Sequence, residues 1–530
     1  MRLLLLLTLT FNIASSLNIL FYQAVIGPSH IAYLRTTIGK LLARGHTIDV
    51  VFAVYNEMAN LDLSPEVRRV YYNRHADPDY WKKNAMHFSN MFEKTSTPMG
   101  EFEIFHEAGY QLCKIAIDDS GLFEFLKTGN YDIGFSSDYD PCGNILMTAA
   151  KIPSIGSLMA TPIFYPQIVG AGLPTVASVY GTPFYPEHDG SLYHKAFNLL
   201  RLTYYHYVIA PDLERKYVCL DLVRKTLTLV IQNQLIRQRF GEKFPDVSKI
   251  ERNLDIVFVN SHDFLEMQRP ISPKIKYIGG MAIRDAKALP QEFEKILSIP
   301  ASAFVLFSFG TQVPTIKMPF QIRKNFVEAF KKFPNVTFLW KYDSLEFDSE
   351  IFENVENVHR LEWLPQTELL HDDRVKLFIS HMGLNSYLET STAGKPVFAI
   401  PLFADQHNNA QNAKKREMGL LVQKDQLTVS NIEATIKELL GNSQYLSNAK
   451  AISKMILERP EKPTDTFINW VEFTAQNPGL HKVLEMPGAG LSPFYYYCGD
   501  VFLILFLVVF IVLHFSLNRV KGVSRKVKID

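Results

Sequence analysis

The segment from residue 375 to residue 406 constrains the fold more than any other part of the chain. An apolar run, 375–380, is followed by a glycine-containing turn, 381–383, and then by a stretch with helical spacing. A parallel α/β sheet presents a helix N-terminus to a phosphate group in this way, through a strand, a tight turn and a helix. The segment therefore predicts a parallel α/β sheet with an anion site at its edge.

Two side chains on the helix of this segment extend the anion site toward a nucleotide. Ser386 and Glu389 lie three residues apart, so they share one helix face. The hydroxyl is near the positive end of the helix dipole, and the carboxylate is a turn further in, where it can accept hydrogen bonds from ribose hydroxyls. The pattern predicts that a nucleotide diphosphate binds here.

The rest of the chain predicts a second unit of the same kind. With 530 residues, 47% of them hydrophobic, the chain can bury the cores of about two domains. Short β-rich runs alternate twice with amphipathic stretches, which indicates parallel α/β domains at 17–268 and 276–480 and a proline-containing linker at 269–275. We expect strands at 18–22, 47–52, 131–135 and 255–259 and then at 304–308, 336–340, 375–380 and 396–400, a helix at 31–43, and a loop-rich insertion at about 153–186.

Both ends of the chain carry membrane signals. Residues 1–16 resemble a secretory signal peptide, since a charged start and an apolar stretch precede small residues; an early spanning helix is the alternative. Residues 494–515 predict one transmembrane helix rather than a buried core helix, and a basic tail, 516–530, follows it. Basic flanks stay in the cytosol, and the last five residues resemble a dilysine retrieval signal. We therefore expect a single-pass type I protein of the endoplasmic reticulum membrane, with its body in the lumen.

The net charge and the cysteine positions limit which partners, metal sites and cross-links we expect. A net charge of +1 does not suggest a nucleic-acid partner. The four cysteines, at positions 113, 142, 219 and 498, form no CxxC or clustered spacing, so we expect neither a zinc site nor a fold that depends on disulfides. One glycosylation sequon begins at Asn335.

Polar residues stand at the strand ends of the second unit. Gly310 and Thr311 follow the first strand there, and Asp405 and Gln406 follow the fourth. In an open parallel sheet the carboxyl ends of the strands face one crevice, where ligands bind. These residues are therefore expected near the turn 381–383.

Together, these residues resemble the signature of the UDP-glycosyltransferase family, which includes the UDP-glucuronosyltransferases and UDP-glucosyltransferases. The match consists of WxxQ from Trp363, HxGxNSxxE from His381, a proline before the next strand, and the pair Asp405-Gln406. The resemblance extends over essentially the whole chain. It implies a GT-B fold, in which two Rossmann-like domains bind the acceptor in the N-terminal half and the UDP-sugar donor in the C-terminal half.

The resemblance also implies roles for individual residues. Trp363 would stack on uracil, Gln366 would hold the ribose or the base, and Glu389 would bind the ribose hydroxyls. Gly383 lets the backbone approach the ligand closely. The diphosphate would be surrounded by Gly310, Thr311, His381, Asn385 and Ser386, and the hydroxyls of the transferred sugar would be held by Asp405 and Gln406.

Catalysis needs a base on the other domain, and the family pattern points to His30. An imidazole can take the proton of an acceptor hydroxyl, and a carboxylate would orient it. Ser137 occupies the position where the family has this acid, so we favour Asp138 as the partner, with Asp140 or no acid as alternatives. Asp138-Tyr139-Asp140 also spells a metal-binding DxD, but we expect no metal or other cofactor, because helix and loop amides in the other half can stabilise the leaving phosphate.

The predicted reaction is one in-line displacement, so the sugar is transferred with inversion to a hydroxyl of a small lipophilic acceptor. A dedicated lipid or sterol glycosyltransferase, and a catalytically weak homologue that binds UDP-sugar or a lipophile, stay open as alternatives. The donor sugar, the acceptor and a homo- or hetero-oligomeric state are likewise open. Recognition of a glucuronate carboxylate would need a cation that the sequence pattern does not identify.

Overall fold

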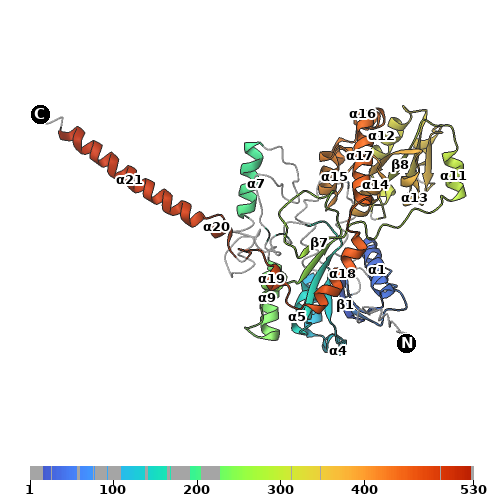
Figure 1. Ribbon diagram of the computed structural model, residues 1–530. Helices are drawn as coiled ribbons and strands as arrows, with labels where there is room; N and C mark the ends of the chain where they lie inside the picture. Colours follow the sequence, from blue (N-terminus) through green and yellow to red (C-terminus); the bar gives the residue numbers. More distant parts are fainter. Residues whose placement is uncertain are drawn as a thin grey trace, which may run out of the picture.

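Two parallel β-sheets form the two lobes of this computed structural model, and one long C-terminal helix extends away from the body (Figure 1). The structure describes residues 16–25, 27–55, 60–75, 109–137, 141–163, 191–204, 227–311, 313–346, 348–489 and 491–526, and the single residues 77, 92, 168 and 173. The predicted α/β fold with two parallel units is thereby confirmed. The predicted signal peptide, apart from Ser16, lies outside the described residues.

The first lobe is built on a seven-stranded sheet in the order β3-β2-β1-β4-β5-β6-β7, and its neighbouring strands are parallel. The strands are β1 (Asn18–Ala24), β2 (Thr47–Val54), β3 (Arg69–Arg74), β4 (Ile133–Ser136), β5 (Ser154–Met159), β6 (Ile256–Val259) and β7 (Ile275–Tyr277). The sequence predicted β1, β2, β4 and β6. It missed β3, which is polar and half-exposed, β5, which lies where we expected loops, and the three-residue strand β7.

The second lobe is built on a six-stranded sheet in the order β10-β9-β8-β11-β12-β13, again with parallel neighbours. The strands are β8 (Ala303–Ser308), β9 (Val336–Lys341), β10 (Val358–Leu361), β11 (Val375–Ser380), β12 (Val397–Ala399) and β13 (Gly419–Leu421). The four strands predicted for this unit are β8, β9, β11 and β12. The two that sequence reasoning missed, β10 and β13, are the short strands at the sheet edges.

The central strands are mostly apolar because both of their faces are buried. On β1, Ile19 and Phe21 point into one core cluster, while Leu20 and Tyr22 point into the cluster on the other face. Strand β8 alternates in the same way between two clusters of the second lobe. Helices therefore cover both faces of each sheet.

The helices of the first lobe are α1 (Pro28–Ala43), α4 (Ser120–Thr128), α5 (Cys142–Ala149), α7 (Leu192–Tyr204), α9 (Leu227–Phe240) and α10 (Val247–Arg252). Those of the second are α11 (Gln291–Leu297), α12 (Phe320–Phe330), α13 (Gln366–His371), α14 (Leu384–Ala393), α15 (Gln406–Lys415), α16 (Val429–Gly441) and α17 (Ser443–Leu457). The helix predicted at 31–43 is α1, which begins earlier because Pro28 suits the first position of a helix.

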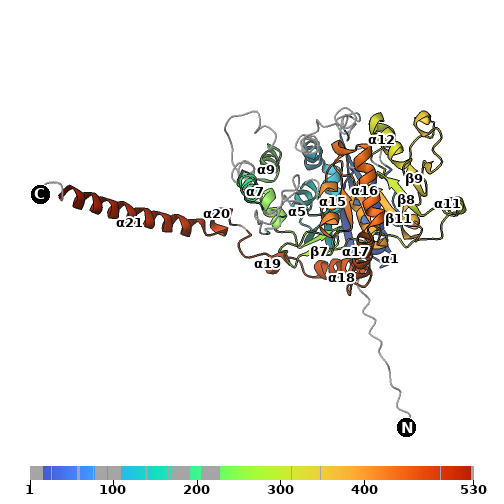
Figure 2. The same cartoon turned by 90° about the horizontal axis from the view of Figure 1, so that it is seen from above.

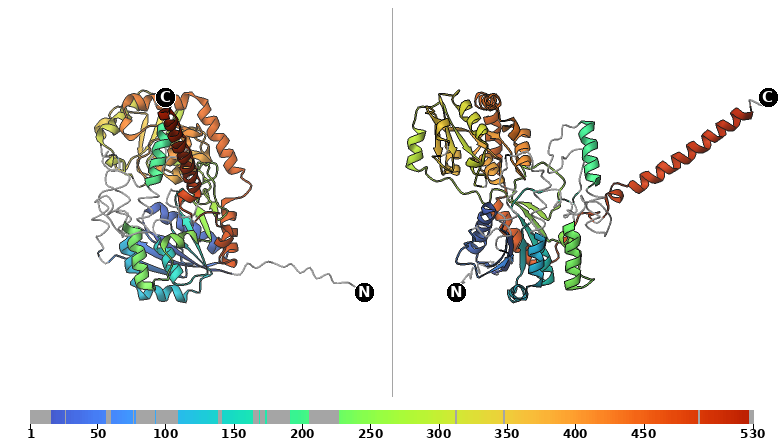
Figure 3. Two further views of the ribbon diagram at one scale, coloured as in Figure 1. Left: turned by 90° about the vertical axis from the view of Figure 1, so that its left-hand side faces the viewer. Right: turned by 180° about the vertical axis from the view of Figure 1, so that it is seen from behind.

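Two elements lie on the other side of the domain boundaries that we predicted. Strand β7 extends the first sheet to Tyr277, so a strand begins inside the predicted linker 269–275. Helix α18 (Pro463–Gln476), which we assigned to the second domain, packs on the first lobe, where Phe467 meets Phe258 with ring centroids 4.9 Å apart. The chain thus crosses back to the first lobe near its C-terminus, as Figure 1 and Figure 3 show.

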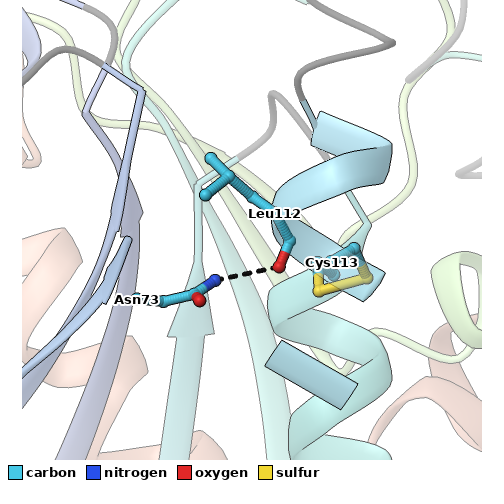
Figure 4. The surroundings of a disulfide bond; sticks show 4 residues. Asn73, Leu112 and Cys113 are labelled. Atoms are coloured by element: carbon cyan, nitrogen blue, oxygen red, sulfur yellow. Dashed lines mark hydrogen bonds between the residues drawn. A yellow bond between two sulfur atoms is a disulfide. The ribbon is translucent and has the colours of Figure 1, made fainter. Parts of the chain in front are cut away.

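A disulfide between Cys113 and Cys142 corrects our expectation that the fold does not depend on disulfides. The two residues are 29 positions apart and have Cα atoms 5.4 Å apart. Figure 4 shows the bond beside the hydrogen bond, 3.0 Å long, that Asn73 donates to the carbonyl of Leu112. The sequence spacing carried no sign of this pair, because the two cysteines meet only when α5 packs beside the helical segment 109–118.

The apolar C-terminal helix α21 (Gly499–Lys526) starts later than the predicted span 494–515. A shorter helix, α20 (Pro493–Tyr496), precedes it, and Cys498 between them has a positive φ of 58°, which interrupts the helical path. The stretch Gly499–Arg519 is long and apolar enough to cross a bilayer, with a mean hydropathy of 2.7. It is the one such helix among the residues that the structure describes.

Candidate active site

The second sheet changes direction between β8 and β11, and most of the predicted donor residues lie at this point. From β8 the chain proceeds outward to β9 and β10, whereas from β11 it proceeds the other way to β12 and β13. Ser308 and Ser380, the last residues of β8 and β11, are paired across the sheet. The turns that follow them, 309–311 and 381–383, are therefore neighbours at a topological switch point, where open α/β sheets bind ligands.

The ring of His381 lies between two glycines. A Cβ atom on Gly383 would stand 2.8 Å from its Nε2 atom, and one on Gly310 would stand 3.0 Å from its Cε1 atom. Gly310 also has a φ of +71°, which favours glycine. The structure thus brings these three predicted residues together, and it leaves no room for a side chain at either glycine.

Burial makes His381 a neutral imidazole. It lowers the pKa of His381 to about 4, with a smaller contribution from the charge of Lys341. The Nδ1 atom is buried and has no hydrogen-bond partner among the residues that the structure describes. A neutral ring can donate one hydrogen bond to a ligand oxygen, as a diphosphate would require.

Gln366, Ser386 and Glu389 form a second cluster at the start of α14. The amide nitrogen of Gln366 donates to Ser386 Oγ at 3.3 Å and also to the Glu389 carboxylate. Thr367 donates to the other Glu389 oxygen, again at 3.3 Å. Burial raises the pKa of Glu389, and these bonds act against that shift.

Asp405 and Gln406 are joined to the His381 turn through α15. Asp405 accepts hydrogen bonds from Asn409, at 2.8 Å, and from the backbone of Leu384, while Asn409 also donates to the carbonyl of Met382 at 3.0 Å. The side-chain carbonyl oxygen of Gln406 accepts hydrogen bonds from the backbone amides of Leu402 and Phe403, at 2.9 and 3.1 Å. Gln406 therefore presents only its amide N–H groups to a ligand.

The remaining predicted donor residues lie on the surface. Trp363 is 58% exposed, and it meets the buried Phe293 edge to face with ring centroids 6.2 Å apart. Its indole is thus available for stacking instead of being part of the core. Asn385 and Thr311 are exposed as well. They make no hydrogen bond with the two clusters in the described part of the chain.

Sequence reasoning missed Lys341, the last residue of β9. Its ammonium donates to the carbonyl oxygen of Gly310 at 2.9 Å and lies 3.4 Å from a carboxylate oxygen of Asp343. Asp343 in turn accepts a bond from the backbone of Thr315, which holds the end of β9 against the loop after β8. Lys341 therefore places a positive charge beside Gly310 and His381. Other site residues were predicted from their positions at strand ends, and the same criterion points to Lys341.

The predicted base, His30, lies in the first lobe at the start of α1. Gly27 is the N-cap of this helix, and the amide of His30 donates to the Gly27 carbonyl at 3.1 Å. Burial of the ring lowers the pKa of His30 to about 4. The imidazole is therefore unprotonated near neutral pH, as a general base must be.

The loop that would carry the acid partner starts next to β1. Ser137 donates its amide to Tyr22 at 2.9 Å and accepts a bond from the Ala24 amide, at 3.0 Å, with its hydroxyl. This buried serine is the residue at which the family resemblance implies an acid, and its hydroxyl accepts a hydrogen bond from the backbone of β1. Asp138 and Asp140 lie outside the described residues.

Comparisons with known proteins agree with this geometry. The sequence profile of the family described as "UDP-glucoronosyl and UDP-glucosyl transferase" matches residues 24–529. The chain is 28% identical over 426 residues to "Putative UDP-glucuronosyltransferase ugt-47" of Caenorhabditis elegans, covering 78% of this chain and 74% of that protein. It is 32% identical over 277 residues to "UDP-glucosyltransferase 2" of Dactylopius coccus, covering 52% of each.

Solved structures show the same fold. A UDP-glucosyltransferase from Polygonum tinctorium, solved in complex with 3,4-dichloroaniline, superposes with a TM-score of 0.58, covering 87% of this chain and 98% of that one. At 16% sequence identity this likeness shows the GT-B fold alone. Because the family profile spans nearly the whole sequence, the chain belongs to the UDP-glucuronosyl and UDP-glucosyl transferase family and is a UDP-glycosyltransferase.

Proposed function

We propose that the protein transfers a glucosyl or glucuronosyl group from a UDP-sugar to a hydroxyl of a small lipophilic acceptor, with inversion at the anomeric carbon. The observation that carries this proposal is the junction of Gly310, Lys341 and His381 at the switch point of the second sheet. A neutral donor, a closely approachable backbone and an ammonium group are together suited to a diphosphate.

In the proposed donor complex, the uracil stacks on the exposed face of Trp363. Gln366 and Glu389 hold the ribose, and the hydroxyls of the transferred sugar bind Asp405 and the amide group of Gln406. The diphosphate lies against the start of α14, where the helix dipole favours negative charge. Gly310, Thr311, Gly383, Asn385 and Ser386 complete this corner, and Lys341 is its cation. No metal ion takes part in this proposal.

In the proposed reaction, His30 removes the proton of the acceptor hydroxyl while that oxygen attacks the anomeric carbon. UDP leaves in the same step, so one bond forms and one breaks on opposite faces of the sugar. The imidazolium that forms is disfavoured by burial, which is why a carboxylate partner is needed. We assign this role to Asp138, and we place the body of the enzyme in the lumen of the endoplasmic reticulum, tethered by α21.

The test uses the purified full chain with labelled UDP-glucose and UDP-glucuronic acid and a panel of phenols and other lipophilic alcohols. We expect a β-linked conjugate, and we expect His30→Ala and His30→Gln to lower turnover by about 10²- to 10⁴-fold. UDP binding should be unchanged in both variants, because His30 lies in the other lobe. Gly39→Ala is the control on the same helix, since a Cβ there has no atom within 4 Å.

Two results would count against the proposal. Full activity of His30→Gln would refute the base assignment. The variants Asp138→Asn and Asp140→Asn separate the two candidate acids, because only the loss of the true partner of His30 should lower turnover. Tight UDP binding without any conjugate would favour the alternative of a binding protein without turnover. That alternative is motivated by Ser137, whose hydroxyl accepts a backbone bond where the family has an acid.

A further inference from the structure

Helix α7 exposes an apolar face to the outside of the first lobe. Leu192 is 83% exposed and Leu200 is 68% exposed, and three further large apolar side chains of this helix are also exposed: Tyr193, Phe197 and Leu199. At 3.6 residues per turn these five side chains fall on one side of the helix. Tyr193 and Phe197 are stacked on one another, with ring centroids 5.8 Å apart.

Among the side chains that the structure describes on α7, the one buried opposite these five is polar. Asn198 is only 2% exposed, although it lies between exposed apolar neighbours in the sequence. Lys195 is exposed on the flank of the helix. A surface helix of a soluble lobe normally buries its leucines and exposes its asparagine, and the described side chains of α7 do the reverse. Such a face needs an apolar partner.

The start of the C-terminal helix lies on the same side of the molecule as α7. Figures 1, 2 and 3 agree on this placement. The chain between α18 and α21 is fastened to the first lobe, where His481 and Asp255 approach to 2.6 Å and Ser272 donates to the carbonyl of Leu484 at 2.8 Å. Helix α21 therefore leaves the body from the lobe that carries α7, not from the donor lobe.

We propose that α7 lies in the surface of the same bilayer that α21 spans, with its apolar face turned into the lipid. This inference rests on the proposed membrane anchoring of α21. An interfacial helix of this kind sits about 5–10 Å into the boundary between headgroups and acyl chains. Exposed Tyr495 and Tyr497, just before α21, are the aromatic residues expected at that depth. Because α21 already tethers the chain, insertion of α7 is an intramolecular event and needs little affinity of its own.

The test measures the depth of single fluorescent labels in the full chain, reconstituted into phosphatidylcholine vesicles. Leu200→Cys carries the label on the apolar face, and Lys195→Cys is the matched control on the same helix. Leu507→Cys reports on α21. All three variants also carry Cys219→Ser and Cys498→Ser, so that the label reacts at one site only. UDP binding is measured to check that each variant is folded. Leu192→Cys is a second position on the apolar face.

We expect lipids brominated near the headgroup to quench the labels at positions 200 and 192 several-fold more than the label at 195. Equal quenching at 200 and 195, with α21 quenched, would overturn this proposal and leave the anchor intact. Protection of position 200 from aqueous iodide without quenching by lipid would assign the face to a second copy or another part of the chain, which also overturns it. The label at position 507 is tested with lipids brominated near the ends of the acyl chains, because this position lies near the middle of the span. No quenching there would refute the anchor itself, and the proposal with it.

Discussion

At the scale of single residues, the proposed contact of Lys341 with the diphosphate can be tested directly. We expect Lys341→Met to weaken UDP binding by roughly 10- to 100-fold, because hydrogen bonds to charged groups are worth about 1.5–3 kcal/mol. Lys341→Arg should retain most of the affinity. Calorimetric titration with UDP and with uridine measures both effects.

Uridine is the internal control for this prediction, since it lacks phosphate. Its affinity should be unchanged in Lys341→Met. An equal loss for uridine and UDP would mean that Lys341 acts only by holding the Gly310 loop through its bond to the carbonyl oxygen. The prediction thus separates a charge that contacts the ligand from a structural contact.

Asp405 should make stability depend on pH. Burial raises the pKa of Asp405 from 3.8 to about 6. Between these two values the native state binds more protons than the unfolded state, so the free energy of unfolding falls as pH rises through this window and levels off above it. Asp405→Asn removes this ionisation. Across the same pH window we therefore expect the free energy of unfolding of the variant to fall by less than that of the original protein, with a difference on the order of 1–3 kcal/mol.

Urea unfolding at several pH values measures this slope. Some slope should persist in the variant, because burial also raises the pKa of Glu266. An unchanged slope would mean that Asp405 keeps an ordinary pKa in the folded protein. The variant should also weaken binding of the UDP-sugar more than binding of UDP, because only the sugar is assigned to Asp405.

The sequence could predict which of the proposed donor residues lie together, because they belong to short motifs at strand ends. His381, Gly383, Ser386 and Glu389 all lie within one turn and one helix, so their proximity follows from local geometry. Lys341 was missed for the opposite reason. Its approach to Gly310 depends on the pairing of β8 with β9, which joins residues 31 positions apart.

At the scale of elements, the disulfide between Cys113 and Cys142 fixes the start of α5. Replacing both cysteines by serine should lower the free energy of unfolding by about 3–4 kcal/mol, the range expected for a closed loop of this length. Chemical denaturation without reductant measures the difference. Cys498→Ser is the control, because Cys498 is exposed and unpaired. An equal stability of the double variant and the original chain would mean that the bond does not form in solution.

Strands β3, β5 and β7 show why element prediction was incomplete. Strand β5 pairs with β6 across about a hundred residues, whereas β3 and β7 pair with predicted strands, β2 and β6, that lie about 20 residues away. The residues of β3 and β5 do not alternate clearly between apolar and polar, and β7 has only three residues, so periodicity gave no signal. Tertiary pairing, not local propensity, makes them strands.

At the scale of the whole molecule, the orientation of the body across the membrane is open to a direct test. Asn335 is exposed in the turn before β9, so a lumenal body would allow its glycosylation. We expect endoglycosidase to increase the gel mobility of the chain, and Asn335→Gln to abolish the shift. Protease treatment of sealed microsomes should remove only a tag at the C-terminus. Digestion of the body with survival of the tag would reverse the orientation.

The sequence by itself determined the two parallel α/β units, the family, the donor motif and the apolar C-terminal helix, because each is written in a local pattern of periodicity, turn chemistry or composition. Only the tertiary structure decided the disulfide, the placement of Lys341, the return of α18 to the first lobe and the outward apolar face of α7. These features depend on which distant segments pack together, and packing is set by the summed burial of both lobes rather than by any one stretch of the chain.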